Sequence, residues 1–484
     1  MENRKLNRRD FLRLSAAAAT GAVLAACAPA AAPQVVKETV VVEKVVEAPA
    51  KPAEKVHIVY QNRSVEEGEA GARARTWAEV SPLFQEKNPN ILVEFRNSPP
   101  ELWDKLMASF TAGNAPDVYE LCCGDTYRVI EMGQALNLQP YIDRDLDELY
   151  MDDYYPEQFK PWKDDKGDIY AMPRDSGAML VYWNVEMFEA EGVDALPKDY
   201  TNNIDHDDYD QIGLKFVRTE EPRRWATTNY GLGANWLTQY HLWAFGASMV
   251  DPDNKDRCAL NTEEAKACLE WCRAAIWDKH TFAYGWASEV GGLGPEPIWM
   301  GERSAMVEMG PWNLLPWCQA KFKWDLAPLP DGPTGLHTAF SSVDSYQGWS
   351  GTKSPDATWE LLKFLASEES HKAYCKYTYR QPCPNRLNEY WVKTLREKEP
   401  RLVEVNMELY AKARLVAHPE EMFHNDSVCK NEILTPAFDK VMLLGEKPVS
   451  YIAPFCELVD RFNVGEIGIE DIGTELEKIE KESG

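Results

Sequence analysis

The body of the chain alternates short apolar runs with amphipathic stretches of helical period. The run VHIVY at residues 56–60 predicts a buried strand, and the long amphipathic stretch after it ends at Asn88–Pro89, before a second apolar run, ILVEF. Proline ends a helix because it lacks a backbone N–H and disfavours helical geometry in the residue before it. Strands that alternate with helices in this way predict an α/β fold.

The same pattern predicts two further helices. Leu102, Leu106 and Phe110 fall on one helical face, Gly113 follows as a helix end, and PDVYEL then predicts another strand. The stretch DATWELLKFLASEESHKAYCKY, residues 356–377, predicts a single helix of more than four turns whose apolar face packs in a core.

The first 27 residues have the layout of an export signal: a basic start, a modest apolar centre and small residues before a cysteine. Arg8–Arg9 followed by Phe11-Leu12 resembles a twin-arginine signal. Leu24-Ala25-Ala26-Cys27 resembles a bacterial lipobox, which implies a signal peptide over 1–26 and lipidation of Cys27. A first transmembrane helix is the alternative, which the short, alanine-rich run disfavours.

Residues 28–55 consist almost wholly of Ala, Pro, Val, Lys and Glu and contain no aromatic residue. This composition predicts a flexible spacer over 27–55, between the lipidated cysteine and a folded body. A short helical or paired segment is the second interpretation. No later apolar run is long enough to span a bilayer.

Composition narrows the functional classes. A chain of 484 residues with 44% hydrophobic residues can bury the cores of two lobes. A formal net charge of −26 argues against nucleic acid or an anionic membrane surface as the main partner. There is no phosphate-binding loop and no haem or Cys-x-x-Cys motif, and the eight histidines show no metal-site spacing, so we expect no cofactor and no metal.

Eleven cysteines include Cys27, which leaves ten in the body. Outside the cytoplasm an even number permits disulfides, although sequence does not fix their pairing. Cys375 and Cys383 are close enough to form a candidate loop. Cys268 and Cys272 share a helical face, but no second pair at zinc-site spacing accompanies them.

Seven segments in fixed order carry a resemblance to a known family. They are Phe84–Val93, Ala112–Val118, Gly167–Pro173 with LVYWN at 180–184, residues 299–306, the Met-Gly-Pro-Trp at 309–312, FKWDLAPLPDGPTG at 322–335, and residues 353–369. Together they resemble a family 1 extracellular solute-binding protein, the maltose-binding-protein-like sugar-binding class of bacterial ABC importers.

The resemblance implies an α/β, two-lobe periplasmic-binding-protein-like clamp whose chain crosses the hinge three times. The motifs put these crossings near Asp175–Met179, Phe340–Asp344 and Arg380–Asn385. Lobe 1 would then hold 56–176 and 343–384, and lobe 2 would hold 177–342 and 385–484. The Asp-rich stretch after Pro197 departs from the family pattern. We interpret it as a solvated turn or a rebuilt helix start, because its oxygen spacing does not match a calcium loop.

A sugar stacks its C–H faces on aromatic rings and offers hydroxyls to planar or charged partners. Among 17 tryptophans, Trp312 is the best candidate, because family members that bind maltose carry a stacking tryptophan at this Gly-Pro-Trp. Trp236 is the second, on a helix that also carries Tyr240 and Trp243. The same stripe is equally expected of a buried helix.

Polar candidates lie at a strand end and at the crossings. Asp125 follows a predicted strand, where open α/β sheets place ligands, although a helix N-cap role is equally expected. The crossings contribute the remaining candidate ligand residues: Asp175, Ser176, Ser341, Ser342, Asp344 and Arg380.

We therefore expect a non-enzymatic protein that binds a mono- or oligosaccharide between two lobes and delivers it to ABC permease subunits. It would act as a monomer on the outer face of the cytoplasmic membrane or in the periplasm, attached only by its lipid. An exported glycoside hydrolase is the alternative from another class and would need two carboxylates about one glycosidic bond. The same fold could also bind a peptide or polyamine. A phosphorylated solute is disfavoured, because no basic or glycine-rich nest is evident.

Overall fold

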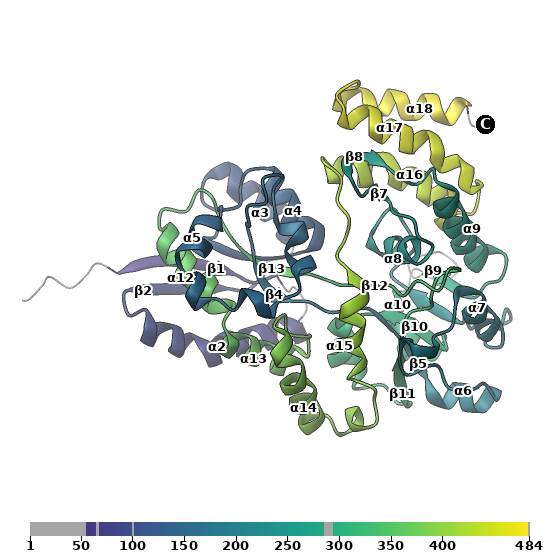
Figure 1. The fold of residues 1–484 in the computed structure, drawn as a ribbon, viewed down its shortest axis with the longest axis horizontal. Helices are drawn as coiled ribbons and strands as arrows, with labels where there is room; N and C mark the ends of the chain where they lie inside the picture. Colours follow the sequence, from purple (N-terminus) through teal and green to yellow (C-terminus); the bar gives the residue numbers. More distant parts are fainter. Residues whose placement is uncertain (1–54, 64–66, 99–100, 285–293, 483–484) are drawn as a thin grey trace, which may run out of the picture. The chain divides into compact units, whose positions relative to one another are not determined.

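The computed structural model describes residues 55–63, 67–98, 101–284 and 294–482. The predicted signal peptide, the lipobox with Cys27 and the spacer up to residue 54 lie outside this part of the chain. The described residues form two α/β lobes, each with its own sheet and core (Figure 1).

Lobe 1 is built on a five-stranded mixed sheet in the order β2-β1-β3-β13-β4. β1 pairs in parallel with β2 and β3, whereas β13 runs antiparallel to β3 and β4. The strands are β1 (Val56–Gln61), β2 (Ile91–Arg96), β3 (Val118–Cys122), β4 (Met172–Asp175) and β13 (Asp344–Gly348).

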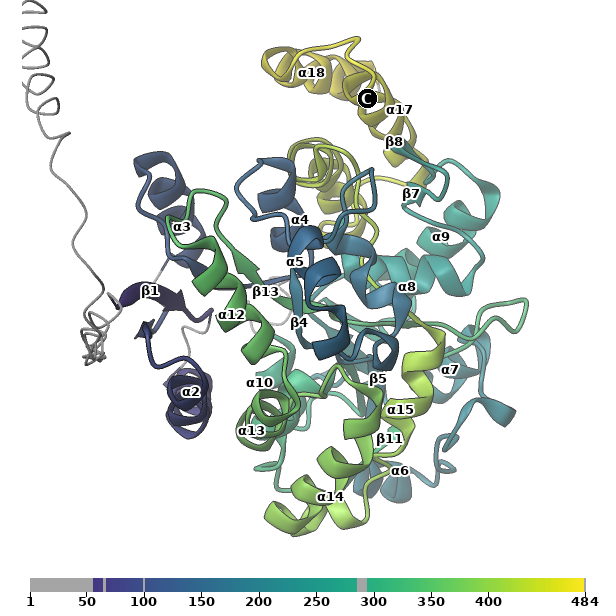
Figure 2. The same cartoon turned by 60° about the vertical axis from the view of Figure 1, so that its left-hand side comes forward.

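Helices cover this sheet because each presents an apolar face to it. α12 packs against β1, β3, β4 and β13, while α2 packs along α13 (Figures 1 and 2). α3 ends at Gly113, whose φ of 68° suits a residue without a Cβ. The helices of this lobe are α2 (Glu67–Lys87), α3 (Leu102–Ala112), α4 (Cys123–Glu131), α5 (Gln139–Arg144), α12 (Pro355–Leu365) and α13 (Glu368–Thr378).

Lobe 2 is centred on β5, which pairs antiparallel with β10 and β11. Every residue of β5 is buried, so this strand runs through the middle of the larger core. The remaining strands of the lobe form short pairs. The strands of lobe 2 are β5 (Leu180–Asn184), β6 (Thr227–Asn229), β7 (Val250–Asp251), β8 (Asn254–Cys258), β9 (Phe282–Tyr284), β10 (Met306–Met309), β11 (Trp324–Ala327), β12 (Ala339–Phe340) and β14 (Ala417–His418).

The helices of lobe 2 surround these strands and continue to the end of the described chain. Two π-helical segments, η10 (Val428–Leu434) and η11 (Asp439–Leu443), flank α16. The α-helices are α6 (Val185–Glu191), α7 (His206–Leu214), α8 (Trp236–Ala244), α9 (Glu263–Trp277), α10 (Pro295–Met300), α11 (Leu314–Trp317), α14 (Asn388–Lys398), α15 (Leu409–Ala413), α16 (Thr435–Phe438), α17 (Ala453–Asn463) and α18 (Ile472–Glu482).

The chain passes between the lobes at three places. It leaves β4 for β5 through 176–179, returns from β12 to β13 through 341–343, and leaves α13 for α14 through 379–387. The three segments lie together. Ser176 N–H donates to the Gln381 carbonyl at 3.2 Å, and Ser342 N–H donates to the Gly177 carbonyl at 3.0 Å. The predicted two-lobe α/β clamp is therefore confirmed.

One predicted helix is wrong in extent. Residues 356–377 do not form one helix but belong to α12 and α13, which are separated at Ala366–Ser367. The Ser367 hydroxyl accepts the Ser370 N–H at 3.4 Å and so caps a new helix. The Asp-rich stretch after Pro197 contains a helix start. The Asp205 carboxylate accepts the Asp208 N–H and so caps the first turn of α7.

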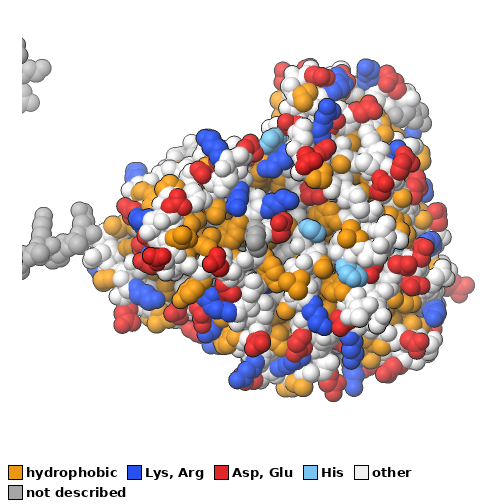
Figure 3. Space-filling model, viewed as in Figure 1, with side chains coloured by type: hydrophobic (Ala, Val, Ile, Leu, Met, Phe, Trp, Pro, Cys, Tyr) orange, Lys and Arg blue, Asp and Glu red, His pale blue; other side chains and the backbone are white. Residues whose placement is uncertain are grey.

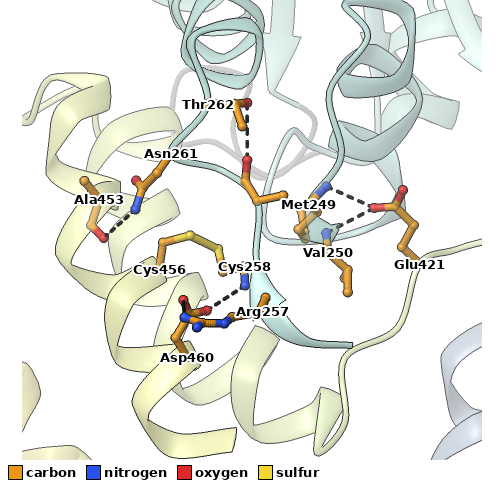
Figure 4. The surroundings of a disulfide bond; sticks show 11 residues. Met249, Val250, Arg257, Cys258, Asn261, Thr262, Glu421, Ala453, Cys456 and Asp460 are labelled. Atoms are coloured by element: carbon orange, nitrogen blue, oxygen red, sulfur yellow. Dashed lines mark hydrogen bonds and ion pairs between the residues drawn. A yellow bond between two sulfur atoms is a disulfide. The ribbon is translucent and has the colours of Figure 1, made fainter. Parts of the chain in front are cut away.

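The candidate loop between Cys375 and Cys383 is not closed by a disulfide. Both cysteines are buried and free, and they pack in different hydrophobic clusters. The disulfide joins Cys258, at the end of β8, to Cys456 in α17 (Figure 4). Asp460, one turn further along α17, accepts the Cys258 N–H at 2.7 Å and reinforces the same junction.

In the described part of the chain, no helix combines the length and apolar character that crossing a membrane requires.

We predict that replacing both Cys258 and Cys456 by serine lowers the free energy of unfolding by roughly 2–5 kcal/mol, because the bond closes a long loop. The measurement is denaturant unfolding of the oxidised protein. Reductant should lower the stability of the natural chain to that of the variant and leave the variant unchanged. Peptide mapping that found Cys258 or Cys456 as a free thiol in the oxidised protein would contradict the assignment.

Candidate ligand cavity between the lobes

A cavity of about 1120 Å³ lies between the lobes. On the face in Figure 3, basic, acidic and histidine side chains gather where the two lobes of Figure 1 meet. Lobe 1, lobe 2 and the crossings all contribute to the lining, which includes Arg63, Asp125, Arg128, Tyr230, Trp236, Glu296, Trp312, Asn313, Phe340, Ser342, Asp344, Thr378, Arg380, Glu420, Asp426 and Asn431.

Trp312 is held by the backbone of its own turn. β10 ends at Met309, and the Gly310-Pro311 that follows directs the indole back over Gly310. A Cβ on Gly310 would lie 2.0 Å from Cζ3 of Trp312, so only glycine fits beneath the ring. A Cβ on Gly177, in the first crossing, would lie 2.4 Å from Cγ of Pro311. The hinge and the aromatic turn are therefore in direct contact.

Trp236 begins α8, where the Asn235 side chain caps the helix by accepting the Leu237 N–H at 2.9 Å. Its ring stacks on Phe340 with centroids 4.5 Å apart and meets Trp312 edge to face at 6.0 Å. Tyr230 adds a third edge-to-face contact at 6.4 Å. These rings form a continuous aromatic wall on lobe 2, which leaves Trp236 and Trp312 half-buried.

A carboxylate and an amide stand beside this wall. The Tyr230 hydroxyl donates to Glu296 Oε1 at 2.5 Å, and the Asn313 amide donates to the same oxygen at 3.1 Å. Burial, followed by the charge of Glu296, raises the pKa of Tyr230 well above its usual range, so its hydroxyl remains a donor. The wall thus combines apolar faces with fixed hydrogen-bonding groups.

Glu308 connects the elements that carry the wall. It is fully buried in β10, four residues before Trp312. Its Oε2 accepts hydrogen bonds from the Asn229 amide at 3.3 Å and from the Tyr240 hydroxyl. Asn229 precedes Tyr230, and Tyr240 lies one turn after Trp236. The Glu308 carboxylate therefore links the segments that carry Tyr230, Trp236 and Trp312.

Lobe 1 presents charged groups at the carboxyl ends of its strands. Arg63 lies just beyond β1, and Asp125 lies in the first turn of α4, just beyond β3. Burial raises the pKa of Asp125 even though Arg63 and Arg128 oppose the shift. Arg128 Nη1 is 3.8 Å from Asp125 Oδ1, and its guanidinium also stacks on Trp103 at 4.4 Å. Cys122 occupies the N-cap of α4, so Asp125 lies inside the first turn and not at the cap position.

The crossings divide the predicted polar residues into two groups. Ser342, Asp344 and Arg380 line the cavity, whereas Asp175, Ser176 and Ser341 do not. Ser176 and Ser341 hydrogen bond to each other at 3.0 Å between buried hydroxyls. Burial opposes the charge of Asp175, but Arg174, Arg380 and Arg73 outweigh it and lower its pKa.

Of the predicted ligand residues, the structure brings Trp312, Trp236, Asp125, Ser342, Asp344 and Arg380 to one cavity. Sequence reasoning missed Arg63, Tyr230, Glu296 and Asn313. Arg63 could have been found, because it follows a predicted strand just as Asp125 does. Tyr230 and Glu296 lie in a loop and a short helix that carry no such signal.

Metal binding finds no support in the side chains that the structure describes, since no group of three or more His, Cys, Asp or Glu residues there could hold an ion.

We predict that Gly310→Ala lowers the free energy of unfolding by about 1–3 kcal/mol, because the new methyl group overlaps the Trp312 ring. Denaturant unfolding measures this change, and near-ultraviolet circular dichroism reports the moved indole. Gly473→Ala in α18 is the matched control, since no atom beyond its chain neighbours and its own helix backbone lies within 4 Å of its Cβ position. Equal effects of the two substitutions would contradict the proposed fit.

The family described as bacterial extracellular solute-binding protein matches residues 83–393. A galactooligosaccharide-binding protein of Bacillus subtilis is 22% identical over 279 residues, which cover 57% of this chain and 62% of that protein.

Solved structures share the fold. An ABC substrate-binding protein of Listeria monocytogenes in complex with cycloalternan aligns with a TM-score of 0.71 at 18% identity, over 84% of this chain and 99% of that chain. A Mycobacterium tuberculosis protein in complex with glycerophosphocholine aligns with a TM-score of 0.69 at 16% identity, over 86% of this chain and 99% of that chain. The resemblance found in the sequence motifs is thus confirmed, and the chain belongs to the bacterial extracellular solute-binding protein family.

Proposed function

We propose that this protein binds a carbohydrate, most simply an oligosaccharide, in the cavity between its lobes and delivers it to an ABC importer. The observation that carries the proposal is the aromatic wall of lobe 2 facing a cavity with charged and amide groups from both lobes. Sugars need both kinds of surface, because their C–H faces stack on rings while their hydroxyls pair with polar groups. The cavity volume of about 1120 Å³ favours more than one sugar ring.

Within this proposal each group has a role. Trp312 and Trp236 stack on the C–H faces of the sugar. Its hydroxyl groups form hydrogen bonds with Asp125, Ser342, Asp344 and Arg380. Asp175, Ser176 and Ser341 act indirectly, since they fix the crossings and not the ligand. Contacts from both lobes would favour the closed arrangement when the solute binds, because a ligand shifts an equilibrium toward the conformer it contacts more.

The cellular setting of this proposal comes from the sequence. The signal over 1–26 would direct export, and acylated Cys27 with the spacer over 27–55 would hold the body near a permease on the outer face of the membrane. Lobe 1 would comprise 56–176 and 343–384, and lobe 2 would comprise 177–342 and 385–484. The protein would act as a monomer, and a separate ATPase would supply the energy of transport.

A role in binding is preferred over catalysis. The family and the similar structures are binding proteins. Several acids that line the cavity already have partners within the protein. Asp344 pairs with Arg174, Glu420 and Asp426 pair with Lys430, and Glu296 accepts two hydrogen bonds. A glycosidase instead needs two carboxyl groups available to one bond.

The test is thermal unfolding of the full chain against maltose, maltotriose, galactobiose, glycerophosphocholine, spermidine and a tripeptide. A sugar present at a hundred times its Kd should stabilise the protein by about 2.7 kcal/mol. We predict such a shift with at least one oligosaccharide and its loss in Trp312→Ala, because the stacking face is removed.

Trp349→Ala is the matched control, since Trp349 packs in lobe 1 and does not line the cavity. It should keep the full ligand-induced shift relative to its own unliganded state. A shift with spermidine, the tripeptide or glycerophosphocholine alone would overturn the carbohydrate assignment. Release of monosaccharide during incubation would overturn the proposal that the protein binds the sugar without hydrolysing it.

A further inference from the structure

Residues 417–428, here called the strap, run from β14 to the start of η10 along the border of lobe 2 that faces lobe 1 (Figure 1). The strap also forms part of the cavity wall through Glu420 and Asp426. A Cβ on Gly124, in the first turn of α4, would lie 3.2 Å from Cε of Met422, so the strap and lobe 1 are in close contact.

The strap is firmly attached to lobe 2. The Glu421 carboxylate accepts the backbone N–H groups of Met249 and Val250 at 2.9 and 3.2 Å (Figure 4) and the indole N–H of Trp243 at 2.6 Å. The His424 N–H donates to the Lys255 carbonyl on β8 at 3.1 Å. The strap therefore packs against β8, and the Cys258–Cys456 disulfide holds β8 against α17.

His424 contacts a carboxylate on each lobe. Its Nδ1 lies 2.8 Å from Asp256 Oδ1 on β8 of lobe 2, and its Nε2 lies 3.3 Å from Asp165 Oδ1 in the 163–169 turn of lobe 1. A neutral imidazole has one N–H and one acceptor nitrogen, whereas a carboxylate only accepts. Both contacts are hydrogen bonds only when the ring is protonated.

Other charged groups surround this histidine. Lys255 Nζ is 3.7 Å from Asp165 and donates to the Tyr127 hydroxyl of α4 at 3.3 Å. The Asn425 N–H donates to Glu131 Oε1, also on α4, at 2.9 Å. The charged and titratable groups around His424 therefore include Asp165, Tyr127 and Glu131 of lobe 1, and Lys255 and Asp256 of β8.

We propose that the strap is a proton-dependent latch, in which protonated His424 bridges Asp165 and Asp256 and favours the closed arrangement of the lobes. The proposal rests on the proposed function only in taking the cavity behind the strap as the solute site. Its consequence is that solute is retained better at mildly acidic pH than at alkaline pH.

The sign follows from the bridge. Burial by itself lowers the pKa of His424, but the hydrogen bonds to Asp256 and Asp165 outweigh it and raise the pKa above the usual value. Opening the lobes removes Asp165 and with it part of the rise. The closed arrangement thus has its full added stability below the pKa that His424 keeps beside Asp256 in the open arrangement, and loses it as pH rises through the higher pKa of the closed arrangement. Burial also raises the pKa of Glu131, so its protonation would favour the closed arrangement in the same direction, and the Glu131→Gln variant separates the two groups.

The test needs no ligand, so it succeeds or fails independently of the carbohydrate assignment. Hydrogen–deuterium exchange is measured on the full chain at pH 6.0 and 8.5, in the natural protein and in His424→Gln. At pH 6.0 we predict about two- to fivefold faster exchange in the variant for lobe 1 peptides that span 160–170, the size expected for a partly exposed ion pair. At pH 8.5 the two proteins should exchange alike.

Three further variants sharpen the result. Asp165→Asn, at a side chain that is 73% exposed, should reproduce the effect in strap peptides without touching a core. Glu131→Gln should retain the pH dependence. His337→Gln is the matched control, because His337 Nδ1 lies 2.7 Å from Asp331 within lobe 2 and should leave residues 160–170 unchanged. Equal protection in the natural protein and both latch variants at pH 6.0, or an equal difference at both pH values, would overturn the latch.

Discussion

The arrangement of the lobes depends on one buried cation, Arg174. Its guanidinium contacts Glu120 on β3 at 2.8 Å, Asp175 on β4 at 2.9 Å and Asp344 on β13 at 2.5 Å, and it is fully buried. The first crossing leaves from β4 and the second arrives at β13, so this ion network fixes where both begin. Removing one member would leave uncompensated buried charge, which costs about 3–5 kcal/mol. The network also reaches the cavity, because Arg380 lies 3.4 Å from both Asp175 and Asp344.

A second buried arginine holds the crossings from the side of lobe 2. Arg414, next to α15, donates to the carbonyl oxygens of Ser176 and Pro382 at 2.7 Å and of Cys383 at 3.2 Å. Burial lowers its pKa to about 10, and it remains charged at neutral pH. Arg414 therefore joins the first crossing to the third, while Arg174 joins the strands that the first and second crossings meet. Gly177 of the first crossing packs against Pro311, so the position of this crossing also affects the position of Trp312.

The cavity combines groups with different degrees of freedom. The aromatic wall belongs to lobe 2, where the buried Glu308 links the elements that carry its rings. Arg63, Asp125 and Arg128 line the cavity from lobe 1. The strap adds a third surface that belongs to lobe 2 but contacts lobe 1 at its outer edge. A solute that contacts all three would be enclosed by relative movement of the lobes without rearrangement of either core.

The sequence by itself determined the alternating strands and helices, because these depend on local periodicity. Its motifs in a fixed order determined the family resemblance, and the resemblance implied the two-lobe clamp. Six of its nine ligand candidates line the cavity. Only the tertiary structure decided that Asp175, Ser176 and Ser341 do not line the cavity, that Cys258 pairs with Cys456 and that Arg63, Tyr230 and Glu296 line the cavity. These facts depend on contacts between residues far apart in the chain, such as Cys258 and Cys456 at a separation of 198, and no local pattern specifies which distant side chains will meet.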